Sequence, residues 1–125
     1  MRAAREGTLF ALKEGLKIFS SLGIHTDRII ASGGGARNEL WLQMQADIFA
    51  TPVQRSSCAE QACLGAAILA ALGAGRFRSL EEACRLVAFE PRIYEPHEPD
   101  SRIYENNYAV YKGLYRQNQP LFGKP

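Results

Sequence analysis

Residues 28–49 decide the fold, and they read RIIASGGGARNELWLQMQADIF. The apolar run Ile29–Ser32 is typical of a short buried strand, and glycines 33–35 allow the backbone to turn through positive φ without side chains in the way. Apolar residues then recur at helical spacing from about Asn38 to Phe49. The pattern predicts a strand, a glycine turn and an amphipathic helix, whose free N–H groups and positive dipole end suit a phosphate or a ribose.

The flanking sequence extends this pattern in both directions. Apolar residues at spacings of three and four predict a helix from about Ala3 to Leu22, and Val53–Arg55 reads as a second short strand. An alanine-rich stretch opened by Ser57–Glu60 predicts a third helix that reaches about Leu72. Because a helix of about a dozen residues separates the two strands, we expect them to be parallel neighbours in an α/β domain.

The last part of the chain is expected to be mostly helical. Ser79 and the acids after it form a capping box for a short helix, whereas residues 89–100 contain three prolines and are expected to form an extended connector with little regular structure. A C-terminal tail helix is predicted within residues 101–122, capped by Asp100 or Ser101. Its tyrosines recur at helical spacing, which is typical of a packing surface.

The composition limits the partners of the chain. With 15 basic and 13 acidic residues in 125, the net charge is +2 and no block of like charge stands out, so we expect no nucleic-acid partner. Neither a membrane-spanning apolar stretch nor a secretory signal is found in the sequence, which predicts a cytoplasmic, soluble protein without a membrane partner. Cys58, Cys63 and Cys84 lack a zinc-ligand spacing and are expected to be reduced, partly buried thiols.

The residues after the glycines distinguish between the known nucleotide motifs. A Walker phosphate loop needs a lysine and a hydroxyl residue where Asn38, Glu39 and Leu40 stand, so that motif is excluded. A dinucleotide fingerprint needs a third small residue at position 38 and a later acid, and neither is present. Two alternatives stay open: an NADP site in which Arg55-Ser56-Ser57 grips the 2′-phosphate, and a tight turn that binds no ligand.

A family resemblance rests on a longer set of residues. The stretch GGGARNELWLQMQADI at 33–48, Thr51-Pro52-Val53 and EQACLGAA at 60–67 resemble the C-terminal domain of FGGY carbohydrate kinases. The likeness extends upstream to residues 5–16, and the tail at 96–122 resembles that of the xylulokinases. Nearly the whole chain is covered, and the spacing within the motifs makes the signal specific.

The resemblance implies a partial actin-like ATPase (ribonuclease H-like) domain, ordered helix-strand-helix-strand-helix with C-terminal helices. In that family two domains close around ATP and a sugar, and residues 1–125 would form the C-terminal part of the second, nucleotide-binding domain. The nucleotide contacts carry over to Gly33, Gly34, Gly35, Ala36 and Asn38. Asn38 has an equally good role as a helix N-cap.

The resemblance also limits what the chain can do alone. The catalytic base, the sugar contacts and the Mg²⁺ ligands are expected outside this chain, so no catalytic or metal residue is assigned to it. We expect a fragment or separately encoded piece of an ATP-dependent kinase for D-xylulose or a near relative, inactive alone, whose open edges are completed by missing segments or by self-association. A free-standing nucleotide or NADP-binding regulatory module remains an alternative, as does an interaction remnant that binds no nucleotide. Gly65 is expected to allow close packing beneath the nucleotide cleft.

Overall fold

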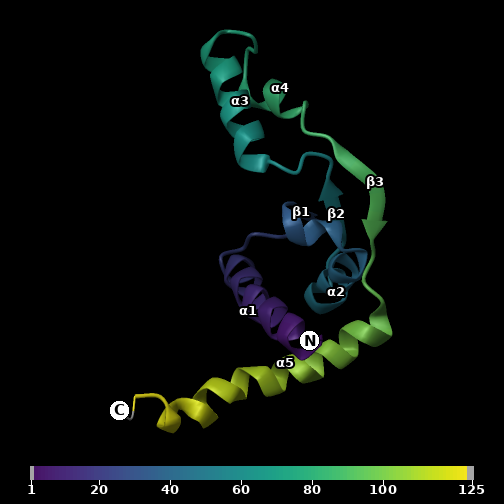
Figure 1. Cartoon of the computed structure of the whole chain (residues 1–125), viewed down its shortest axis with the longest axis vertical. Coiled ribbons are helices and arrows are strands. Elements are labelled where there is room, and N and C mark those ends of the chain that lie inside the picture. The colour runs from purple at the N-terminus through teal and green to yellow at the C-terminus, as the bar shows by residue number, and fades with distance from the viewer. Residues whose placement is uncertain (1, 124–125) are drawn as a thin grey trace.

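The computed structural model describes residues 2–123, which form five helices of α type, three strands and two short 3₁₀ turns (Figure 1). The elements follow the order α1 (Arg2–Ser21), β1 (Ile29–Ala31), η1 (Gly34–Arg37), α2 (Glu39–Phe49), β2 (Val53–Ser56), α3 (Gln61–Gly73), α4 (Leu80–Cys84), β3 (Phe89–Tyr94), α5 (Glu98–Asn118) and η2 (Gln119–Leu121). The fold is α/β, as the alternation of apolar runs predicted.

The sheet has three strands in the order β1-β2-β3. β1 and β2 are parallel, with Ile29 opposite Val53 and Ala31 opposite Arg55, which confirms the expected parallel pair. Helix α2 connects them and ends where Ala50 takes the left-handed conformation, at φ 51°. The parallel pairing therefore brings the C-terminal ends of β1 and β2 to the same edge of the sheet.

The prediction for residues 89–100 was wrong, because the segment contains a strand. β3 pairs antiparallel with β2, and the register shifts between Gln54 and Ser56. Pro91 lies in β3 at this irregularity, and β3 is an edge strand. A proline is tolerated at an edge or a bulge, where its missing N–H breaks no regular ladder.

Helix α5 also begins earlier than the sequence predicted, at Glu98 instead of Asp100 or Ser101. Pro99 stands in its first turn, where a helix has no internal use for the N–H that proline lacks. The proline therefore opens the helix instead of preceding it. Ser79 caps α4 as predicted, since the Glu82 N–H donates to Ser79 Oγ at 3.2 Å, but the Glu82 carboxylate accepts the Arg78 N–H at 2.8 Å instead of closing the box on Ser79.

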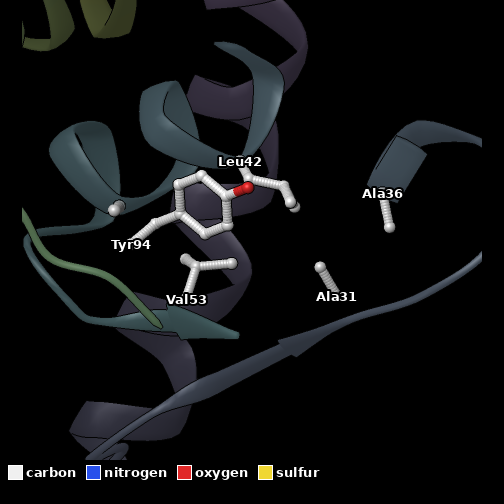
Figure 2. Packing of buried hydrophobic residues seen from close by; sticks show 6 residues of the cluster. Ala31, Ala36, Leu42, Val53 and Tyr94 are labelled. Carbon is white, nitrogen blue, oxygen red and sulfur yellow. The ribbon is translucent and has the colours of Figure 1, made fainter. Parts of the chain in front are cut away.

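Two clusters of buried residues form the core. The sheet cluster joins β1, η1, α2, β2 and β3, and Figure 2 shows Leu42, Val53 and Tyr94 grouped together with Ala31 and Ala36 to one side of them. Its buried members are Ala31, Ala36, Leu42, Ala46, Val53 and Tyr94. The helical seam joins α1, α2 and α5 through Leu9, Phe10, Ile48, Tyr104 and Tyr108. Both clusters meet at α2, so the helix after the glycines is fixed from two sides.

Helices α3 and α4 lie at one end of the elongated molecule, away from α1, α2 and α5 (Figure 1). The expected close approach at Gly65 is not found, because a Cβ added there would meet nothing within 4 Å. The cysteines also differ from the expectation: Cys63 and Cys84 are exposed, and only Cys58 is half-buried. Within residues 2–123, no helix combines the length and hydropathy needed to cross a bilayer.

Candidate functional site

The glycine turn (residues 33–38) follows β1 directly and leads into α2. Gly33 takes φ 75° and ψ −165°, a combination that is essentially restricted to glycine. Gly34 and Gly35 lie in the 3₁₀ helix η1, so Gly33 alone of the three glycines uses the positive φ that such residues allow. The chain therefore inserts one tight turn between the strand and the N-terminus of α2.

The other two glycines have different surroundings. A Cβ on Gly35 would lie 3.2 Å from the Trp41 indole nitrogen, so the missing side chain allows the indole to pack against the turn. A Cβ on Gly34 would meet nothing within 4 Å. Gly34 thus presents bare backbone to open space, as a ligand-binding turn requires.

Asn38 and Ala36 hold the turn to the fold. The Trp41 N–H donates to Asn38 Oδ1 at 3.1 Å, so Asn38 does cap α2. Asn38 is exposed beyond this cap, and its amide nitrogen remains available to a ligand. Ala36 is only 4% exposed, and its side chain belongs to the sheet cluster, which leaves its backbone as the part that could contact a nucleotide.

Two hollows flank the turn. The strand-end hollow, with a volume of about 140 Å³, lies where β1 and β2 end and is lined by Gly33 and Ala36 together with Ser32, Arg37, Arg55 and Ser57. The helix-side hollow, of about 220 Å³, is lined by Gly35 and Asn38 together with Arg5 and Trp41. The structure thus places the predicted nucleotide contacts in one turn. Gly33 and Ala36 line the strand-end hollow, whereas Gly35 and Asn38 line the helix-side hollow.

Arg55 is already occupied by protein groups. Its Nη2 lies 2.6 Å from Glu90 Oε2, and its Nη1 donates to the Ala36 carbonyl at 3.3 Å. A guanidinium neutralised by a carboxylate is poorly suited to grip a further phosphate. The structure therefore does not favour the NADP alternative, which relied on this side chain.

Comparison with known proteins decides the family. Residues 1–74 match the model of the FGGY family of carbohydrate kinases, C-terminal domain. The chain belongs to this family. It is 37% identical over 120 residues to the xylulose kinase of Staphylococcus epidermidis, and 37% identical over 121 residues to that of Bacillus subtilis. These matches cover 96% and 97% of the chain but only 24% of each relative, so the chain spans about a quarter of their length.

The fold agrees with this assignment. The crystal structure of a xylulose kinase from Rhodospirillum rubrum superposes with a TM-score of 0.82 at 27% identity, over 98% of this chain and 25% of that one. The expectation of a partial actin-like α/β domain is confirmed. In this FGGY domain the glycine turn is therefore part of a sugar-kinase scaffold and not of a Rossmann fold.

A second polar cluster lies toward the other end of α2, away from the glycine turn. Asp47, His97 and Asp100 place ligand-type atoms within 4.8 Å of one another. Asp47 Oδ1 accepts the His97 N–H at 2.8 Å and the Gln43 amide at 2.9 Å, so this buried carboxylate caps the start of α5. These bonds account for the buried Asp47, and the cluster as a whole lies away from the glycine turn of the FGGY domain.

Sequence reasoning missed three residues around the turn. Arg37 stands two residues after the last glycine and could have been noted for its charge, since a cation beside the turn would attract an anionic ligand. Trp41 entered only as a residue of the family motif and of the apolar pattern of the helix, although its indole packs against the turn at Gly35. Arg5 lies about 30 residues away on α1, and no local pattern could have placed it beside Asn38.

Proposed function

We propose that this chain is the ATP-binding portion of a carbohydrate kinase that transfers the γ-phosphoryl group of ATP to a hydroxyl of D-xylulose. Membership of the FGGY family supports the sugar-kinase class, and the two relatives named xylulose kinase support the sugar. The observation that carries the proposal is the glycine turn at the carboxyl ends of two parallel strands, the usual ligand edge of an α/β sheet. The proposal includes a cytoplasmic location, where ATP is available.

The residues of the turn fit a nucleotide. Gly33, Gly34 and Gly35 would approach it with backbone alone, the backbone of Ala36 would continue this surface, and the Asn38 amide would reach the base. When bound, ATP supplies the phosphoryl group, and residues 33–38 bind and orient the nucleotide. The buried Asp47 carboxylate accepts the His97 N–H at the start of α5 and lies away from the glycine turn. The proposal therefore assigns the Mg²⁺ ligands and the general base to the remaining three quarters of such a kinase.

The proposal also treats the chain as inactive on its own. An apolar groove of about 420 Å³ runs between α1 and the glycine turn, and it is lined by Leu12, Leu16, Phe19, Ile30, Trp41 and Phe49. β1 borders this groove and is an edge strand with unpaired backbone groups. Both features suit the docking of further sheet and helix sequence of the same kinase.

Calorimetry of the chain with ATP, ADP and NADP tests the nucleotide site. We expect ATP and ADP to bind and NADP not to bind. Gly34→Leu fills the open space before the turn without a positive-φ conflict, so it should abolish ADP binding and leave the circular dichroism spectrum unchanged. Selective binding of NADP would reject the kinase proposal in favour of the dinucleotide module.

Complementation tests the claim about the whole enzyme. The chain is mixed with the part of the Bacillus subtilis xylulose kinase that lies outside its match to this chain, and phosphorylation of D-xylulose is measured. We expect activity from the mixture and none from either piece. A mixture that assembles but neither binds ATP nor phosphorylates the sugar would favour an interaction remnant.

A further inference from the structure

The conformation of Gly33 needs support from its surroundings. Backbone in this region of φ and ψ costs free energy, and it persists only where neighbouring contacts determine it. Inside the turn, the Ala36 N–H donates to the Gly33 carbonyl and the Asn38 N–H donates to the Gly35 carbonyl, both at 3.2 Å. These bonds shape the turn itself, but they do not fix it relative to the sheet.

Arg55 reaches the turn from the sheet through a side-chain hydrogen bond. It stands on β2 opposite Ala31, the last residue of β1, so its side chain starts beside the point where the turn begins. One arm of its guanidinium, Nη1, donates to the Ala36 carbonyl at 3.3 Å. The contact ties η1 to β2 at the edge where the nucleotide is proposed to bind.

Glu90 on β3 holds the other arm of this guanidinium. Glu90 Oε2 lies 2.6 Å from Arg55 Nη2, and the Arg55 side chain is 26% exposed, so water screens this pair less than a fully exposed one. The Arg55 Nε is buried without a hydrogen-bond partner among residues 2–123, which is a cost that the other two contacts must offset. The planar guanidinium thus links β3, β2 and the turn in one fixed geometry.

We infer that Arg55, oriented by Glu90, is a positioning residue that sets the glycine turn for nucleotide binding. This inference rests on the proposed function, because it assigns the turn a ligand. Arg55 itself is neutralised and acts through the backbone of Ala36. A lysine could keep the ion pair with Glu90, but its single ammonium group cannot present two divergent donors in a plane.

Amide hydrogen exchange of the full chain tests the positioning step without any ligand. Ala36 and Asn38 are the reporters, because their N–H groups are hydrogen-bonded within the turn. Arg55→Gln, Arg55→Lys and Glu90→Gln should each speed exchange at these two amides by about tenfold, since local opening becomes easier. Amides of α1 and α5 should keep their rates in all three variants.

Arg102→Gln is the matched control. It removes an arginine from an ion pair with Glu98 on the exposed face of α5, away from the turn, and should change neither reporter. Unchanged exchange at Ala36 and Asn38 in Arg55→Gln and Glu90→Gln would overturn the inference. Loss of protection throughout α1 and α5 in both variants would also overturn it, because Arg55 would then serve the folding of the whole chain.

ADP affinity then connects the turn to the ligand. Arg55→Gln and Arg55→Lys should weaken ADP binding by about tenfold, as expected for the loss of a charged hydrogen bond that organises a site. Faster exchange with unaltered ADP affinity would overturn the role of Arg55 in nucleotide binding. If the wild-type chain binds no ADP, the proposed function is contradicted. Faster exchange in the variants would then still show that Arg55 supports the turn.

Discussion

Helices α3 and α5 reverse the usual relation between hydropathy and burial. α5 is rich in charged and amide residues, yet it buries Tyr104 and Tyr108 against α1 and α2. α3 consists mainly of alanine, leucine and other apolar residues, yet Ile68 is its only buried member. The polar helix buries two tyrosines in the helical seam, whereas the apolar helix buries one residue and takes no part in either core cluster.

The difference shows which surfaces this chain completes by itself. A helix that is apolar all round is normally covered on every side, and α3 has no such cover among residues 2–123. α5 packs its buried tyrosines against α1 and α2 within the chain, although Ile103, Val110 and Leu114 on its other side stay exposed. We therefore expect the helical seam to determine the stability of this chain and α3 to contribute little to it.

Several kinds of contact reinforce the seam. The Phe10 ring lies 5.8 Å from that of Tyr108 and 5.5 Å from that of Tyr111, centroid to centroid. Lys13 is buried and donates to Glu105 at 2.6 Å, and the Tyr108 hydroxyl donates to Glu14. These contacts join residues about 90 positions apart, so they close the chain on itself.

Leu9→Ala should have the largest effect on stability. Leu9 is fully buried in the seam, and removing its side chain leaves a cavity between α1 and α5. We expect the free energy of unfolding to fall by about 3 kcal/mol. Urea unfolding followed by circular dichroism measures the change.

Leu12→Ala is the control on the same helix, because Leu12 is 55% exposed. It should cost less than about 1 kcal/mol. Equal losses in the two variants would mean that the seam is not the stabilising region, and the contrast with α3 would fail.

Gly33→Ala should have the next largest effect. The left-handed φ of Gly33 strains any other residue, whatever space surrounds it. We expect a loss of about 2 kcal/mol in the free energy of unfolding. Gly34→Ala should be neutral or slightly stabilising, because Gly34 has neither a positive φ nor a close neighbour. A loss in Gly34→Ala that matched that in Gly33→Ala would contradict the distinct roles of the two glycines.

Sequence patterns predicted the parts of this fold that depend on local chemistry. A strand at residues 29–32, a helix from about Asn38 and a cap at Asn38 follow from apolar period and capping preference, and they form as β1 at 29–31 and as α2 from Glu39 with its Asn38 cap. The assignment of nucleotide contacts to the glycine turn stays a prediction. What the structure adds there is that the φ of Gly33 and the Trp41 indole beside Gly35 each favour a glycine, whereas Gly34 has neither constraint.

The errors arose where distant contacts override local signals. Three prolines predicted a connector at 89–100, but pairing with β2 makes part of that segment a strand, and Pro99 fits the first turn of α5. The interaction of Arg55 with Glu90 and Ala36 depends on the strand register, which the sequence does not specify. Likewise, hydropathy alone would place an apolar helix such as α3 in the core. Its exposure depends on which packing partners residues 2–123 offer it.

Tyr108 should give the seam a dependence on alkaline pH. Burial, and next the hydrogen bond to Glu14, raise the pKa of the Tyr108 hydroxyl above its ordinary value of 10. The unfolded chain releases this proton near pH 10 while the folded chain keeps it, so the stabilisation is complete below pH 10 and declines as the pH rises.

Tyr108→Phe should remove this part of the decline, which amounts to at most about 1.4 kcal/mol between pH 10 and pH 11. Urea midpoints at pH 8, 10 and 11 measure it. Tyr115→Phe serves as the control, because Tyr115 lies on the same helix and is 67% exposed. If the two variants lose stability with pH at the same rate, Tyr108 does not carry the effect.

Leu69→Ser on α3 should have the smallest effect on the isolated chain. Leu69 is 62% exposed, so the substitution removes little apolar contact and should change the free energy of unfolding by less than about 0.5 kcal/mol. In the complementation mixture, the same substitution should reduce recovered activity, because there we expect the remaining kinase sequence to cover α3. A large loss of stability in the isolated chain would mean that α3 is already packed in solution. The exposure of α3 would then not reflect a missing partner, and the contrast between α3 and α5 would disappear.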